Sequence, residues 1–424
     1  MFNTRICLVA LGIMAATQAV ASEQSESKGF VADSSLNVLL RNAYINRDYK
    51  NTTRNDSAEW GQGVIATFSS GFTQGTVGVG VDAFGLYAAR LDGGSGRSGN
   101  GGIDFFKQDG NGNAAHDLSR LGGAVKFRLS NTVLKFGDMM PALPVMQYDD
   151  SRLLPESFTG TMITSKEIEG LEINAGHFTQ EARKSATGRD SGGLKKIDVL
   201  GGSYTFNENL KGSLYGIDVQ DIYKQQYLGL TYVHALSQTE ALTLDFNGYR
   251  TDIDREYADT LGSGDSNRIW SLAATYTTGV HSFTLAHQRS SGSAGYPYGW
   301  YQNEGGVGNG GSSIYLANSY WSDFNAEDER SWQLGYGLDF ATLGVPGLTY
   351  RLAYVRGDNI RTNDGDATER EIFNQVQYVV QSGVAKDLKL RARSSILRVS
   401  DKASNYMNSG NEVRLFVEYP ISVF

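Results

Sequence analysis

A strict alternation of apolar and polar residues constrains this chain more than any other feature. In SWQLGYGLDF (residues 331–340), every even position from Trp332 to Phe340 is apolar, and the odd positions carry Ser, Gln, Gly and Asp. The segments 241–248 and 282–288 repeat the pattern. A period of two residues is that of a β-strand with two different faces. Stretches of about ten residues, separated by Gly-, Asn-, Asp- and Ser-rich turns, continue from about residue 35 to the C-terminus, so we expect an all-β fold.

Two features favour a transmembrane antiparallel β-barrel over a soluble β-sandwich. Tyr, Trp or Phe often stands near a strand end on the apolar face, as in the aromatic girdles at membrane interfaces. Short turns such as FNENLK (206–211) alternate with long Gly- and Asn-rich segments (91–117 and 288–330), as short periplasmic turns alternate with long external loops in such barrels. About 400 exported residues, at roughly 22 per strand and turn, predict about 18 strands.

The two ends of the chain fit an exported barrel. Residues 1–21 combine Arg5, a short apolar run and the small residues AVA, which predicts a cleaved signal peptide. Residues 22–424 show no linker, so we expect a single barrel domain in a Gram-negative outer membrane. The closing RLFVEYPISVF resembles the assembly signal of outer-membrane barrels, although Phe424 lies off the apolar parity and Pro420 is expected to disturb the ladder. Cys7, the only cysteine, lies in the signal segment, which excludes disulfides and Cys-based metal sites in the mature chain.

One strand near the C-terminus places cations on alternate positions. In DLKLRARSSILRVS (387–400), Lys389, Arg391 and Arg393 share one face, and Leu and Ala residues occupy the other. Arg or Lys on the lipid face at the bilayer midplane costs about 2–4 kcal/mol, so these cations must face the lumen. Arg398 lies off their parity, which places it either at the membrane edge or beyond a bulge.

Cations also lie on one face of other strands. Arg41 and Arg47 belong to the first strand and Arg414 to the last, and these two strands are neighbours in a closed barrel. Three adjacent strands therefore form a basic wall in a chain with a net charge of −8. One interpretation is a track for anions, because rows of Arg and Lys select anions in pores. The other is that these cations merely pair with acids such as Glu412 and Glu418.

Two segments resemble a known family. DSSLNVLLRNAYINRDY (33–49) resembles the first strand of the OprD-type outer-membrane carboxylate channels (porins) of pseudomonads. GDMMPALPVMQYDDSRLLPESFTG (137–160) resembles their inward-folded third external loop. The resemblance covers essentially the whole mature chain. It implies an 18-stranded monomer, with a weak trimer as the alternative, a basic ladder on the lumen wall and an eyelet built from inward loops. The ladder would comprise Arg41, Arg47, Lys389, Arg391, Arg393 and Arg414, with Arg351 and Arg128 as weaker members, and the eyelet loop Asp149, Asp150, Ser151 and Arg152, with its acids facing the ladder.

The same resemblance implies passive, substrate-selective uptake of small carboxylates. YDDSRLLPESFTG is more similar to the branch that takes aromatic monocarboxylates of benzoate type, and basic amino acids are the alternative. The partners implied are small carboxylate solutes, outer-membrane lipid and lipopolysaccharide. We expect no cofactor, no metal and no nucleic acid.

Other chemistry is weakly supported. The segment 109–120 mimics a calcium loop but has Ala114 where the turn needs Gly and Arg120 where the bidentate Glu belongs. The five histidines are scattered without metal-ligand spacing. Two further alternatives stay open: an outer-membrane barrel enzyme, for which His177 or His116 would supply the base, and a secreted adhesive or sugar-binding β-protein.

Overall fold

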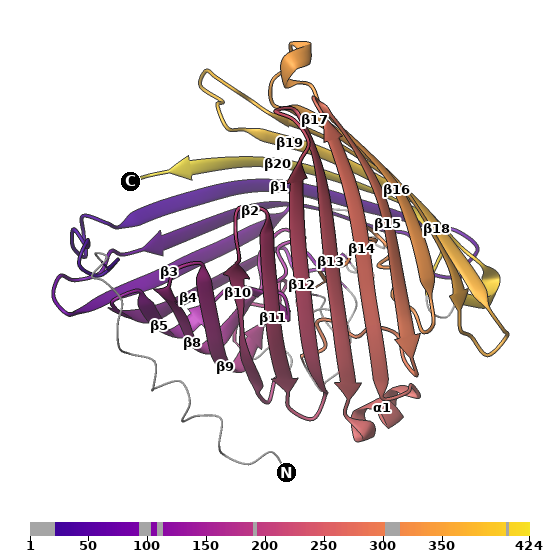
Figure 1. The fold of residues 1–424 in the computed structure, drawn as a ribbon, viewed down its shortest axis with the longest axis horizontal. Coiled ribbons are helices and arrows are strands. Elements are labelled where there is room, and N and C mark those ends of the chain that lie inside the picture. The colour runs from indigo at the N-terminus through magenta and orange to yellow at the C-terminus, as the bar shows by residue number, and fades with distance from the viewer. Residues whose placement is uncertain (1–21, 93–102, 108–112, 190–192, 302–313, 404–406) are drawn as a thin grey trace.

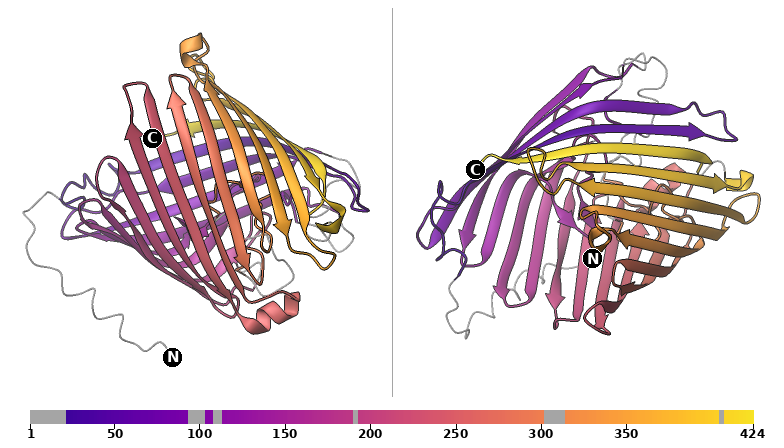
Figure 2. Two further views of the ribbon diagram at one scale, coloured as in Figure 1. Left: turned by 45° about the vertical axis from the view of Figure 1, so that its right-hand side comes forward. Right: turned by 90° about the horizontal axis from the view of Figure 1, so that it is seen from above.

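The computed structural model is a closed barrel of 18 antiparallel strands (Figures 1 and 2). It describes residues 22–92, 103–107, 113–189, 193–301, 314–403 and 407–424. The predicted signal peptide, with Cys7, lies outside this range. The barrel strands are β1 (Ser35–Tyr49), β2 (Ser57–Ser69), β3 (Val77–Arg90), β4 (Asp117–Leu129), β5 (Thr132–Met139), β8 (Ser157–Ile168), β9 (Leu171–Ala182), β10 (Ile197–Thr205), β11 (Leu210–Val219), β12 (Tyr223–Ala235), β13 (Glu240–Ile253), β14 (Ser266–Thr278), β15 (His281–Gly292), β16 (Arg330–Asp339), β17 (Leu348–Ile360), β18 (Ala367–Val379), β19 (Lys389–Val399) and β20 (Gly410–Ser422).

Each strand pairs with its sequence neighbours, and β1 closes the barrel by pairing with both β2 and β20. The closing pair extends from Asn37 opposite Ser422 to Tyr49 opposite Gly410. Pairing therefore continues past Pro420, and the expected disturbance of the ladder does not end β20. The register of β18 with β19 is also continuous, which places Arg398 on the outer face at the external edge without a bulge.

The connections differ in length at the two ends of the barrel, as predicted. At the periplasmic end, β4–β5 and β14–β15 are joined by residues 130–131 and 279–280. At the external end, 91–116 and 293–329 are the longest connections, and 254–265 contains helix α1 (Arg255–Leu261). Two short 3-10 helices lie at Ala341–Leu343 and Asp401–Ala403. No helix in the described part of the chain is long and apolar enough to cross a membrane.

The two faces of the wall differ in chemistry, as the alternation predicts. On the outside, Leu121 is 83 % exposed and Leu214 and Leu334 are each 65 % exposed. A continuous band of such side chains is what a lipid-facing surface requires. The inner face carries polar and charged groups, and much of it is covered by two loops that fold into the lumen.

The first inward loop, residues 140–156, connects β5 to β8 and contains a small hairpin of β6 (Ala142–Leu143) and β7 (Met146–Gln147). Where the loop begins, Gly137 has a φ of +131°, and an added Cβ would lie 2.4 Å from the carbonyl oxygen of Gly123. Leu153 is fully buried against β2, where an added Cβ at Gly61 would lie 2.4 Å from its side chain. The SRLLP segment therefore packs on the wall at Gly61, where a larger residue would collide with Leu153.

The second inward loop is described at residues 293–301 and 314–329, in a segment for which the sequence predicts an ordinary long external loop. In the structure, Tyr301 is fully buried, and its ring centroid lies 5.6 Å from that of Phe158 on β8. Residues of both inward loops, including Val145 and Tyr296, join one apolar cluster inside the barrel. Part of the barrel interior is therefore a packed apolar core.

A matched pair of arginine substitutions on β15 tests which face contacts lipid. Leu285 is 51 % exposed on the outer face, whereas Thr284 lines a lumen cavity. We expect Leu285→Arg to lower the free energy of unfolding in lipid vesicles by about 2–4 kcal/mol if it lies near the midplane, and less near the interface. Thr284→Arg should change it much less, because the guanidinium reaches water. Urea titration of reconstituted protein compares them, and equal losses would contradict the assignment of faces.

Candidate functional site

Closure of the barrel brings cations of β1, β19 and β20 onto one side of the lumen. In the register, Arg41 lies opposite Glu418, and Glu418 lies opposite Lys389. The Glu418 carboxylate contacts Arg41 at 2.9 Å and Lys389 at 2.7 Å, and Arg391 only at 3.8 Å. We call the six cations of these strands the basic wall: Arg41, Arg47, Lys389, Arg391, Arg393 and Arg414.

Nearer the external end of the barrel, Glu412 likewise forms ion pairs with two cations of the basic wall. It is 3 % exposed and lies 2.7 Å from Arg47 and 2.5 Å from Arg414. A single buried carboxylate between two guanidinium groups offsets one of their two positive charges. Pairing with acids, the plainer of the two interpretations, therefore accounts for four members of the wall, including Lys389.

Arg393 is the exception within the basic wall. Among the described residues, it makes no ion pair and no hydrogen bond, and the same holds for Arg351 on β17. Both line one polar cavity of about 470 Å³. The six cations of the basic wall face three carboxylates in contact with it, Glu412, Glu418 and Asp150, which leaves an excess of three positive charges.

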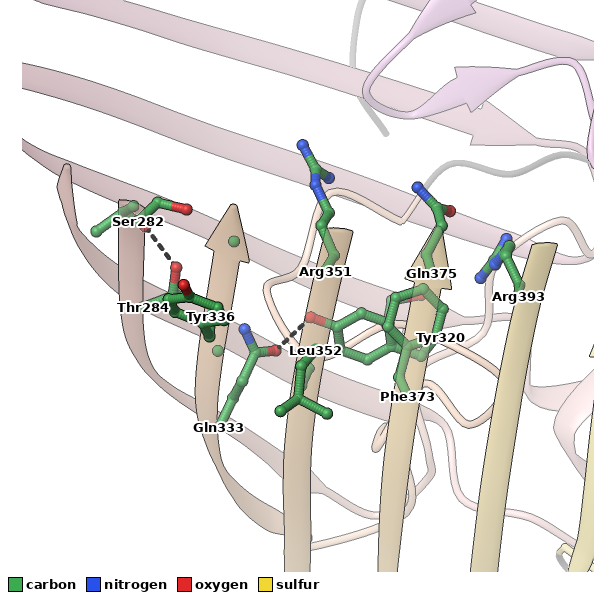
Figure 3. Close-up of a pocket in the computed structure, with 15 residues that line it drawn as sticks. Ser282, Thr284, Tyr320, Gln333, Tyr336, Arg351, Leu352, Phe373, Gln375 and Arg393 are labelled. Atoms are coloured by element: carbon green, nitrogen blue, oxygen red, sulfur yellow. Dashed lines mark hydrogen bonds between the residues drawn. The ribbon is translucent and has the colours of Figure 1, made fainter. Parts of the chain in front are cut away.

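Figure 3 shows the cavity with Arg351, Gln375 and Arg393 in a row on β17, β18 and β19. Gln375 lies opposite both arginines in the register. Tyr320 of the second inward loop reaches into the cavity, and its hydroxyl donates a hydrogen bond to Gln333 at 2.9 Å. The cavity thus combines two unneutralised cations, amide groups and aromatic rings.

Asp150 attaches the first inward loop to the basic wall. Its two oxygens accept hydrogen bonds from Arg41 at 2.6 and 3.0 Å, and Arg41 also donates to the Arg152 carbonyl at 3.1 Å. Arg152 turns its Nε to the Ile103 carbonyl, and burial together with the charges of Arg414 and Arg47 lowers its pKa to about 10. Ser151 is exposed and donates its backbone N–H to Asp149.

Asp149 does not face the ladder, so the expectation that it does is wrong. The residue is 6 % exposed and accepts a hydrogen bond from Lys184 at 2.8 Å, on the loop after β9. Burial alone would raise the pKa of Asp149, but the Lys184 ammonium lowers it below its usual range. Its role is to hold the loop's shape. Alternation could not reveal this, because a loop has no parity.

Two pairs of buried carboxyl groups fasten the inward loops to the wall. Glu156 ends the first loop and hydrogen-bonds to Glu181 of β9, and Glu329 ends the second loop and hydrogen-bonds to Glu369 of β18. All four are at most 2 % exposed. Burial, with the neighbouring carboxyl, raises the pKa of Glu156 and of Glu329 well above the ordinary value. Two carboxylates in contact cannot both ionise, so each pair shares a proton.

The second inward loop also carries an acid that sequence reasoning missed. Asp323 is partly buried and accepts hydrogen bonds from the hydroxyls of Ser319 and Tyr298. Burial raises its pKa. Ser319 lines the same cavity as Arg351. The segments YPYGWY and SYWSDF are dense in aromatics for an exposed loop, and this is the signal that could have revealed the inward fold.

Arg128 does not lie with the ladder. It is on β4, its Nε donates to Gln24 at 2.9 Å, and its guanidinium lies 4.2 Å from the Phe72 ring centroid. On the same strand, Lys126 binds Asp82, which also binds Lys135 of β5, each at 2.6 Å. This second charged group lies on strands away from the basic wall, and Asp82 offsets part of its positive charge.

The other candidate chemistry has structural explanations. His177 lies 2.6 Å from Asp198, and His116 lies 3.2 Å from Arg90. Arg120 donates to the Arg183 carbonyl at 2.6 Å. Asp109 and Asn111 of the calcium-like segment lie outside the described residues. Within the described part, no three His, Cys, Asp or Glu side chains form a metal site.

Comparison with known proteins extends over nearly the whole chain. Residues 28–423 match the family model described as outer membrane porin, OprD family. The chain is 43 % identical to Porin D of Pseudomonas aeruginosa, over 96 % of this chain and 95 % of that protein. OccAB1 of Acinetobacter baumannii superimposes with a TM-score of 0.89 and 38 % identity, over 95 % of this chain and 100 % of that one. OpdK of P. aeruginosa, solved with vanillate, superimposes with a TM-score of 0.82 and 31 % identity, over 93 % of this chain and 100 % of that one.

Glu412→Gln should destabilise the barrel, because it leaves Arg47 and Arg414 buried without their shared carboxylate. Breaking a buried ion pair by removing one partner costs about 3–5 kcal/mol. The matched control is Glu327→Gln, in the exposed pair with Arg361, which should change stability far less. Urea unfolding followed by tryptophan fluorescence measures both. Similar losses would mean that Glu412 is not a tether of the basic wall.

Glu329→Gln keeps the shape and a hydrogen-bond donor but cannot ionise. Because the pKa of Glu329 is raised in the folded protein, wild-type stability falls as the pH rises from about 4.3 through the raised value. We expect the variant to lose this part of the pH dependence and to be more stable than wild type at alkaline pH. Unfolding between about pH 5 and pH 9 tests this, with exposed Glu256→Gln as control. Unchanged pH dependence in Glu329→Gln would contradict the shared proton.

Proposed function

Because this chain belongs to the OprD family of outer-membrane porins, we propose that it admits small carboxylates, and aromatic monocarboxylates of benzoate type above others. The observation that carries the proposal is the pair Arg351 and Arg393. They are cations without an acid partner among the described residues, and they lie in one cavity of about 470 Å³ on the lumen wall. A guanidinium can hold a carboxylate with two hydrogen bonds.

The rings beside these arginines support an aromatic solute. The centroids of Tyr320 and Phe373 lie 4.5 Å apart, and both residues line the cavity. A benzoate-like acid could set its carboxylate on Arg393 or Arg351 and its ring against these side chains. OpdK, the relative solved with vanillate, is a channel of similar fold that was crystallised with an aromatic acid.

The rest of the basic wall supports passage without trapping. Members that are already paired with Glu412 or Glu418 add weak, shared attraction above and below the free arginines. Several weak sites in series allow a solute both to enter and to leave. The Asp150–Arg41 contact, at 2.6 Å, keeps the first inward loop against this wall and narrows the path beside it.

Two classes of function are set aside by family membership. The chain is a porin and not a barrel enzyme, so His116 and His177 need no catalytic role. It is an outer-membrane protein and not a secreted binding protein. Passive movement through the lumen needs no cofactor.

Basic amino acids are the second candidate, and Asp323 is the observation in their favour. A solute with a carboxylate and a cationic group could place its carboxylate on Arg393 and its cationic group near Asp323. Against this, both Asp323 oxygens already accept hydroxyl hydrogen bonds from Ser319 and Tyr298. Burial also raises the pKa of Asp323, which weakens its attraction for a cation.

The test is the double variant Arg351→Gln/Arg393→Gln in planar bilayers and liposomes. Anion preference should fall, and the half-saturating benzoate concentration should rise roughly tenfold, as expected when a charge-assisted hydrogen bond is lost. The matched control is Arg356→Gln/Arg398→Gln, which removes the same charges from the outer face of β17 and β19. Unchanged benzoate uptake in the lumen variant would overturn the proposal.

The same assay separates the two substrate classes. If aromatic acids are the substrates, benzoate should block the channel current at lower concentration than arginine does, and Asp323→Asn should leave benzoate unaffected. Preferential uptake of arginine that is lost in Asp323→Asn would establish the second candidate instead.

A further inference from the structure

Two arginines of the basic wall lie against aromatic rings of the inner wall. The guanidinium carbon of Arg391 lies 4.7 Å from the ring centroid of Phe416, and that of Arg393 lies 5.0 Å from the centroid of Phe373. Both rings face inward and are buried, Phe416 at 4 % and Phe373 at 5 % exposure. We propose that Phe373 and Phe416 are positioning residues that hold these guanidinium groups in place without neutralising them. This inference rests on the proposed function.

The contrast with the rest of the wall carries the argument. Arg41, Arg47 and Arg414 are held by carboxylates at 2.9, 2.7 and 2.5 Å, and each such contact cancels charge. Arg391 has a single ion pair at 3.8 Å, and its buried Nε has no hydrogen-bond partner. Arg393 has no ion pair among the described residues. The two members with the least acid contact therefore lie 4.7 and 5.0 Å from phenylalanine rings, whereas the acid-paired Arg47 lies farther from a ring, 5.8 Å from the Trp321 centroid.

A ring face differs from a carboxylate in what it leaves available. It attracts a cation through its quadrupole but carries no net charge, and it does not use the N–H donors at the edge of the guanidinium. The charge and the donors of Arg391 and Arg393 then remain for an anion in the lumen. A carboxylate at the same place would hold the arginine equally well and cancel it.

Phe373 is itself held by the second inward loop. Tyr320 packs on it with ring centroids 4.5 Å apart, and the Tyr320 hydroxyl is anchored to Gln333 of β16 (Figure 3). Contacts thus lead from the loop through two rings to Arg393. Without the ring, Arg393 could turn toward Glu412 or Glu371, which already attract it.

The variants that test this are Phe373→Leu and Phe373→Tyr, each alone and with Arg393→Gln. Phe373→Leu should reduce anion preference and raise the half-saturating benzoate concentration roughly threefold to tenfold, because the guanidinium loses its platform. Phe373→Tyr keeps a ring face and should leave both the anion preference and the half-saturating benzoate concentration close to wild type. In the Arg393→Gln background, Phe373→Leu should have no further effect. Phe283→Leu, on the lipid face, is the control for loss of an aromatic side chain.

Each outcome decides the matter. An equal effect of Phe373→Leu with and without Arg393 would show that the ring only supports the fold, and no effect in wild type would show that Arg393 needs no platform. If Phe373→Leu fails to assemble, Phe416→Leu in the presence and absence of Arg391→Gln gives the same comparison. If Arg393→Gln and Arg391→Gln themselves leave selectivity unchanged, the proposed function fails first, and this inference fails with it.

Discussion

A sheet in lipid has no water to satisfy the backbone groups of an open edge, so its first and last strands must pair. The rest of this structure depends on that constraint. Pairing of β1 with β20 sets Arg41 opposite Glu418 and Arg47 opposite Glu412 across 377 and 365 residues of chain. The alternation of faces places all four groups inside. The strand pairing that closes the barrel therefore also brings the charged groups of the basic wall together.

The lumen separates two uses of positive charge. Glu412, Glu418 and Asp150 take up the cations that fasten strands and loop together, and those cations have little charge left to offer. Arg351 and Arg393 form no ion pair among the described residues and line one cavity. In the proposed function, anion selectivity comes from these few cations. This arrangement explains how a chain with a net charge of −8 can present a basic passage.

The alternation of residues along each strand made much of the fold and of the charge placement predictable. Alternation and turn asymmetry predicted the barrel and the side on which Lys389, Arg391 and Arg393 lie, and the chain length predicted about 18 strands. Family resemblance located the first inward loop. Parity ends where strands end, so it could not show that Asp149 contacts Lys184, or that residues 293–301 and 314–329 fold inward. It also could not tell paired cations from free ones, because Arg414 and Arg393 both face the lumen, yet only Arg414 forms an ion pair with Glu412.

The contacts of Arg41 bear on how the barrel assembles in the membrane. Its guanidinium bonds at once to Glu418 on the last strand and to Asp150 on the first inward loop. Before β20 pairs with β1, Arg41 lacks Glu418, one of the two carboxylates that hold its guanidinium in place. The full set of contacts around Arg41 therefore forms only in the closed barrel. Pairing of the first and last strands and the fixing of the residue that holds the first inward loop are thus coupled.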